Sequence, residues 1–200
     1  MTDNLNLYHF LVILIFTTIV LSLIWARLCF FKTSPQSNRF ALILYDPFVA
    51  TQTAVAYERM FFDDPLPAAK AWLAISAYSF SLWFFCWSIR SAKGLGFAFS
   101  EASGTLLWVG SYSIVRHPFY TAYILTWTTT TLLFDSTYLW ITLAYLMFFY
   151  TLSAKQEEEH IKRSKLSKDY EAYKCKTGMF FPRVTQWINW LSKLLPTRFQ

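Results

Sequence analysis

The 200-residue sequence is poor in charge: Asp, Glu, Lys and Arg make up 15% of it, whereas a soluble domain carries roughly a quarter. Hydrophobic residues contribute 55%, and they are gathered in long runs. Residues 7–25 and 72–89 contain no charged side chain. Uncharged runs of about 18 residues or more are typical of membrane-spanning helices. The sequence therefore excludes an ordinary soluble domain and predicts an all-α polytopic membrane protein built as one domain.

The sequence also has no basic residue at its N-terminus and few cysteines, and both facts narrow the class of membrane protein. Residues 1–9 contain no Lys or Arg, and the apolar run after them is too long for a secretory signal, so we expect a retained first span. The three cysteines, Cys29, Cys86 and Cys175, are far apart and form no CxxC pair. This spacing predicts neither a disulfide framework nor a metal site.

Five spans are predicted from the apolar runs: about 7–31, 41–62, 68–90, 118–134 and 137–154. The second is the least apolar, because it holds Asp46, Pro47, Gln52 and Glu58, and a re-entrant or kinked segment is the alternative. With five spans, Arg59 and Lys70 fall on one side and the other 16 of the 18 basic residues on the opposite side. The positive-inside rule then places the N-terminus outside and the C-terminal tail in the cytoplasm.

The net charge of +6 is concentrated after the last apolar run, where ten of the 18 basic residues follow from Lys155 onward. This distribution favours a cytoplasmic tail facing anionic lipid over a nucleic-acid-binding surface. Residues 155–174 have helix-forming composition, and we expect them to continue the fifth helix until Gly178 and Pro182 end it. The pattern of 184–200 predicts an amphipathic helix on the membrane surface. The compact chain favours a bacterial inner membrane over the endoplasmic reticulum.

The stretch "SIVRHPFY" (residues 113–120) places Arg116, His117 and Tyr120 around a proline at the edge of the fourth apolar run. A residue before proline is extended, and proline suits the first turn of a helix, so span four should begin at Pro118 with His117 near its N-cap. The unpaired N–H groups there, with Arg116, predict a site for an anion. The simpler alternative is a snorkelling arginine and a tyrosine of the aromatic belt.

An acidic cluster, residues 157–159, lies where span five leaves the apolar region. Spans four and five are joined by about three residues, 135–137, so they should form an antiparallel hairpin with neighbouring cytoplasmic ends. The glutamates should therefore meet the segment 116–120. Such a polar pocket at membrane depth suits a zwitterion that bears an ammonium and a carboxylate.

Both segments resemble signatures of one family. "GSYSIVRHPFY" (110–120) resembles the G-x-Y-x-x-x-R-H-P-x-Y signature of the isoprenylcysteine carboxyl methyltransferase family. "EEEHIKRSKLSKDYEAYKCKTGMFFP" (157–182) resembles its second signature, a Glu pair followed by Y-x-x-Y and a proline. With the hairpin between them, the resemblance covers about 94–183, after N-terminal spans in 1–93 and before the tail 184–200. It implies a membrane-embedded, S-adenosylmethionine-dependent methyltransferase acting on a lipid-like or isoprenylcysteine-type acceptor, with carboxyl O-methylation favoured.

The resemblance also implies site residues. The residues that it assigns to the cofactor are Tyr112, His117, Pro118, Phe119, Tyr120, Glu157 and Glu158, with Gly96 and residues 104–107 as weaker candidates. The candidate catalytic residues are Arg116, His117 and Lys155. The family holds the substrate carboxylate with an arginine at the position of Ser153. Lys155 lies two residues further along the chain, but its ammonium cannot make the bidentate contact that a guanidinium makes.

This departure leaves the acceptor open, and phospholipid N-methylation or thiol S-methylation are the alternatives. An NADPH-dependent sterol-type reductase is a further alternative, although such enzymes read R-H-P-N-Y where Phe119 stands here. The last alternative is a non-enzymatic membrane protein whose polar cluster is structural. The expected partners are the bilayer and a hydrophobic or prenylated acceptor, with no nucleic acid and no metal.

Overall fold

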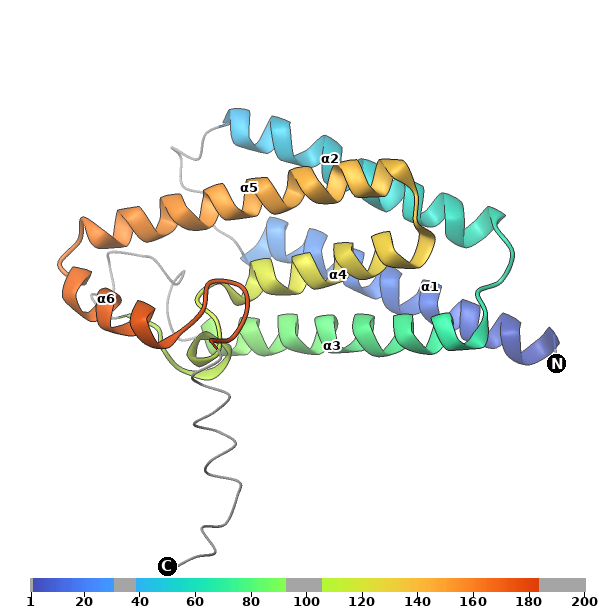
Figure 1. Ribbon diagram of the computed structural model, residues 1–200, viewed down its shortest axis with the longest axis horizontal. Coiled ribbons are helices and arrows are strands. Elements are labelled where there is room, and N and C mark those ends of the chain that lie inside the picture. Colours follow the sequence, from blue (N-terminus) through green and yellow to red (C-terminus); the bar gives the residue numbers. More distant parts are fainter. Residues whose placement is uncertain (1, 31–38, 93–105, 184–200) are drawn as a thin grey trace, which may run out of the picture. The chain divides into compact units, whose positions relative to one another are not determined.

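The computed structural model describes residues 2–30, 39–92 and 106–183, and within these ranges the secondary structure is helical. The elements in chain order are α1 (Thr2–Trp25), η1 (a π-helical turn, Ala26–Phe30), α2 (Arg39–Phe62), α3 (Ala68–Ala92), η2 (a 3₁₀ turn, Gly110–Ser113), α4 (Pro118–Phe134), α5 (Thr137–Lys162) and α6 (Ser167–Lys176) (Figure 1). The prediction of an all-α chain is confirmed. The predicted helix in 184–200, Gly96 and residues 104–105 lie outside the described residues.

Three helical stretches in the described part are long and apolar enough to cross a membrane: Leu7–Phe30, Ala68–Ala92 and Thr137–Lys162. The other two predicted spans are helices but do not share these properties. α4 has 17 residues and a length of about 26 Å, slightly short of the roughly 30 Å hydrocarbon core. α2 is one helix from Arg39 to Phe62 with Pro47 inside it.

The chain forms two compact units that are described here one at a time. The helical unit consists of residues 1–83 and 122–152. The site unit consists of residues 84–121 and 153–200. The boundaries fall inside α3, α4 and α5, so each of these helices contributes to both units.

Polar side chains inside the helical unit are paired with one another. Gln52 of α2 is fully buried, and its amide nitrogen lies 3.0 Å from Thr131 Oγ1 of α4, to which it donates. Its amide oxygen accepts a hydrogen bond from Thr142 of α5. The hydroxyls of Tyr78 on α3 and Thr130 on α4 lie 2.8 Å apart. Because an unpaired polar group is costly in an apolar environment, these contacts explain how α2 tolerates a polar residue at its centre.

Asp46, another polar residue of α2, is bound by Arg27 of η1. The guanidinium donates to both carboxylate oxygens, and the Nη2–Oδ2 distance is 2.8 Å. The two side chains are 39% and 47% exposed, so the pair contributes modestly to stability while joining η1 to α2.

The end of α5 differs from the sequence prediction. α5 does extend past its apolar part to Lys162, but the helix predicted over 155–174 is interrupted. The Ser164 hydroxyl donates to the Ile161 carbonyl at 2.7 Å, which is the local side-chain bonding that competes with a continuing helix. α6 then folds back beside the end of α5 (Figure 1), where Ile161, Tyr170 and Tyr173 form a buried cluster. Burying both tyrosines offsets the cost of breaking the helix.

Candidate functional site

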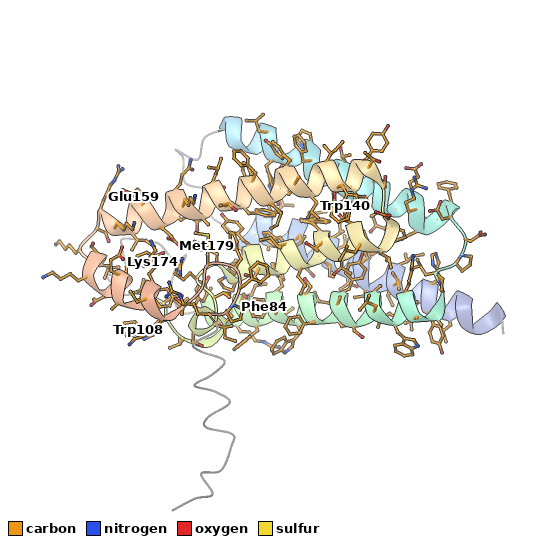
Figure 2. The ribbon with its side chains drawn as sticks, in the orientation of Figure 1. Phe84, Trp108, Trp140, Glu159, Lys174 and Met179 are labelled. Atoms are coloured by element: carbon orange, nitrogen blue, oxygen red, sulfur yellow. The ribbon has the colours of Figure 1, made fainter. Side chains whose placement is uncertain are left out.

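The backbone before α4 is held extended by a segment that follows α6 in the chain. Val115 forms an isolated parallel bridge with Gly178. The amide of Arg116 donates to the Gly178 carbonyl at 2.8 Å, and that of His117 donates to Met179 (Figure 2) at 3.1 Å. α4 begins at Pro118 as predicted. The His117 carbonyl accepts the amide of Thr121 at 3.0 Å, which confirms His117 at the N-cap.

Glu158 is the centre of a buried ionic cluster at the end of α5. Its side chain is 6% exposed, and Oε1 accepts a hydrogen bond from Arg116 Nε at 2.8 Å. Lys174 of α6 (Figure 2) places Nζ 3.6 Å from Oε2. Arg116 is equally buried and also donates to the carbonyl of Thr177. The guanidinium therefore joins the start of α4, the end of α5 and the segment after α6.

Both ring nitrogens of His117 face carboxylates. Nδ1 lies 3.2 Å from Glu157 Oε2, and Nε2 lies 3.3 Å from Glu158 Oε1. A neutral imidazole has one N–H, so donation to both carboxylates requires the protonated ring. Burial lowers the pKa of His117, but the hydrogen bonds and charges of Glu157 and Glu158 outweigh burial, and the net pKa is raised. In this arrangement Glu157 and Glu158 favour the protonated form of His117.

Glu157 is the more accessible of the two carboxylates. Its side chain is 31% exposed, and Oε1 accepts a hydrogen bond from the Tyr120 hydroxyl at 2.6 Å. The Tyr120 ring stacks on the His117 ring, with centroids 5.8 Å apart and planes 22° apart. Glu157 is thus held by two side chains from the start of α4 and remains reachable by a ligand.

A small pocket lies next to the ionic cluster; it is partly open to solvent, and its volume of about 10 Å³ is room for about one water molecule. The Tyr173 hydroxyl donates to the Tyr112 carbonyl at 2.6 Å and so ties α6 to η2 at its edge. The pocket lining consists of Leu106, Leu107, Tyr112, Arg116, His117, Tyr170 and Tyr173.

The structure brings together most of the residues predicted for the site. Those within the cluster or the pocket lining are Tyr112, Arg116, His117, Tyr120, Glu157 and Glu158. Pro118 is buried at the first position of α4. Phe119 packs edge-to-face on Phe85, with centroids 5.7 Å apart. Lys155 is exposed, and among the contacts of the described residues we find none that joins it to the cluster.

One expectation changes at this point, and three further residues of the site are new. The anion opposite His117 and Arg116 is not supplied by a ligand, because the carboxylates of Glu157 and Glu158 occupy that position. The sequence prediction also assigned no individual role to Tyr170, Tyr173 or Lys174. The Y-x-x-Y spacing was the available signal, since residues at i and i+3 share one helix face.

Comparison of the sequence with family models and with curated proteins finds no match. The functional argument therefore depends on the residues and on their geometry.

The raised pKa of His117 predicts a pH dependence of stability. The unfolded value is about 6.5. Because the folded pKa is higher, the stabilisation is fully present below the unfolded pKa and is lost as pH rises through the folded pKa. We expect the melting temperature of the purified protein to fall as pH rises above about 6.5, and we expect His117→Gln to flatten this slope. His160→Gln, at an exposed position of α5, is the matched control. Equal slopes in His117→Gln and the unmodified protein would contradict a protonated His117.

Proposed function

We propose that the protein is an integral membrane S-adenosylmethionine-dependent methyltransferase with a lipid-like or isoprenylcysteine-type acceptor. One observation carries the proposal. The two segments that resemble the family's signatures, 110–120 and 157–182, lie together in the site unit. They are joined by backbone pairing at Val115 and Gly178 and by the Arg116–Glu158 ion pair. A resemblance that arose by chance would not require the two segments to meet residue by residue.

The residues present fit the proposed cofactor. S-adenosylmethionine, when bound, supplies an electrophilic methyl group on a sulfonium. The half-buried carboxylate of Glu157 is suited to accept from an ammonium or a ribose hydroxyl. The faces of Tyr112 and Tyr120 are suited to attract the sulfonium.

The chain's own contribution to an in-line methyl transfer is alignment, which supplies much of the rate enhancement of such reactions. Arg116 and His117 act as positioning residues in this proposal, because their charges are directed at Glu157 and Glu158. A carboxylate acceptor needs no general base. Because Glu157 and Glu158 favour protonated His117, we favour carboxyl O-methylation over thiol or amine methylation, for which a proton acceptor would be useful.

The proposed topology has five spans, with α2 and α4 accompanying the three longest apolar helices. The N-terminus is outside and the tail is in the cytoplasm, since the 16 basic residues other than Arg59 and Lys70 then share one side. The proposed site unit then lies at the cytoplasmic face. A bacterial plasma membrane is the proposed location.

Cofactor binding tests the proposal directly. We expect the full chain in lipid nanodiscs to bind S-adenosylhomocysteine in a calorimetric titration. Glu157→Ala should lower the affinity by about tenfold or more, because it removes a charge-assisted hydrogen bond. Glu159→Ala, at an exposed neighbouring position, is the matched control and should bind normally. Transfer of labelled methyl groups into prenylated peptides, phospholipids and thiols would then identify the acceptor.

The alternatives give different results in the same titration. Binding of NADPH without binding of S-adenosylmethionine or S-adenosylhomocysteine would replace the proposal with a reductase. A protein that binds none of these ligands, and whose Glu157→Ala variant is merely less stable, would have a structural cluster.

A further inference from the structure

The ion pair of Arg27 and Asp46 lies among exposed apolar side chains of the helical unit. Arg27 is three residues from the end of Leu7–Phe30, a stretch that is long and apolar enough to cross a membrane. Leu28, directly after it, is 77% exposed, and Trp25 and Leu44 are about half exposed. In a membrane, acyl chains cover such side chains, whereas charged groups are costly away from the headgroups. The pair therefore marks the level at which acyl chains end and headgroups begin.

The geometry of the pair leaves both charges accessible. Nη1 and Nη2 of Arg27 each donate to one carboxylate oxygen of Asp46, so the pair engages two of the five N–H donors of the guanidinium. Each carboxylate oxygen has a further lone pair that can accept another hydrogen bond. Both side chains are more than a third exposed. A positive and a negative group are thus presented side by side.

This arrangement indicates the chemistry of a matching headgroup. Phosphate oxygens are well suited to the remaining guanidinium N–H groups of Arg27. A primary ammonium has three donors, one of which can reach Asp46. A headgroup that carries only a phosphate charge would be repelled by Asp46, and a quaternary ammonium has no N–H to donate. The best match is a zwitterionic phospholipid with a primary ammonium, whose acyl chains can lie along Leu28 and Leu44.

We propose that Arg27 and Asp46 form a binding site for the headgroup of such a phospholipid, with the phosphate on Arg27 and the ammonium on Asp46. The bound lipid would join η1 to α2 in addition to the ion pair. This inference requires that α1 crosses a membrane, but it does not depend on methyl transfer.

Lipid retention by the full chain tests the site. The protein is purified in detergent, mixed with equal amounts of phosphatidylethanolamine, phosphatidylcholine and phosphatidylglycerol of one chain length, and examined by native mass spectrometry. We expect it to retain phosphatidylethanolamine about tenfold more than phosphatidylglycerol, because a charge-assisted hydrogen bond to Asp46 separates the two lipids. Asp46→Asn should remove this preference by lowering phosphatidylethanolamine retention. Retention of phosphatidylglycerol should stay the same or rise, because the charge of Arg27 remains.

A second ion pair of the helical unit provides the matched control. Arg59 and Asp63 are 40% and 47% exposed, nearly the same as Arg27 and Asp46. Glu58 and Asp64 are exposed beside them in the sequence, and these extra carboxylates disfavour a phosphate. Asp63→Asn should therefore leave the retention of all three lipids unchanged.

The possible outcomes are distinct. Equal retention of the three lipids by the unmodified protein, or undiminished phosphatidylethanolamine retention by Asp46→Asn, would overturn the inference. An equal loss of all three lipids in Asp46→Asn would also overturn it, because the pair would then only hold η1 to α2. Asp46→Asn should bind S-adenosylhomocysteine as the unmodified protein does, so the lipid site and the methyltransferase can each fail alone.

Discussion

Replacing Arg116 with methionine is expected to destabilise the protein by about 3–5 kcal/mol, the cost of removing one partner from a buried ion pair. Methionine keeps most of the apolar stem and removes the guanidinium. Glu158 would then remain buried after losing its shortest charged contact, the 2.8 Å bond from Arg116 Nε. The Thr177 carbonyl would also lose its donor. Both losses occur at buried positions inside the site unit.

A double-mutant cycle identifies the pair as the cause. Glu158→Gln combined with Arg116→Met should recover part of the lost stability, because no uncompensated charge is left behind. The quantity to measure is the unfolding free energy in denaturant titrations of the purified protein. Arg183→Met is the matched control, since Arg183 is exposed and its contact is to the Cys175 carbonyl. An Arg116→Met variant as stable as the unmodified protein would contradict the stabilising role of the ion pair.

The start of α4 and its meeting with the glutamates could be predicted because both depend on local rules. Proline fixes the first turn of a helix, and a three-residue connection forces two helices to be antiparallel. The individual partners could not be predicted. Adjacent residues on a helix point about 100° apart, so Tyr120 reaches Glu157 and Arg116 reaches Glu158, and sequence order does not say which.

Two other features could not be predicted from the sequence: the return of α6 beside α5, and the pairing of Val115 with Gly178. Both depend on contacts between residues far apart in the chain, namely the burial of Tyr170 and Tyr173 and the bridge across 63 positions. Local helix propensity favoured one continuous helix and was overridden by this burial. The polarity of α2 was similarly ambiguous, because a buried Gln52 that is paired with Thr131 looks in sequence like an exposed one.

Gly178→Ala is expected to destabilise the site unit by about 3 kcal/mol or more, at or above the upper end for an overpacked position. A Cβ atom on Gly178 would lie 1.7 Å from the carbonyl oxygen of Phe181 and 2.9 Å from its carbonyl carbon. These are backbone atoms, so no rotation of a side chain can relieve the contact. The segment after α6 would have to move, and it carries the carbonyls that accept the amides of Arg116 and His117.

The effect on ligand binding should exceed the effect on stability alone. Moving the carbonyls of Gly178 and Met179 releases the backbone that aims Arg116 and His117 at the glutamates, so S-adenosylhomocysteine affinity should be lost even at temperatures where the variant remains folded. Lys176→Ala, at an exposed position two residues earlier, should keep both the melting temperature and the affinity. If Gly178→Ala kept them too, the segment after α6 would be free to adjust. The pairing of the two signature segments would then not be what assembles the site.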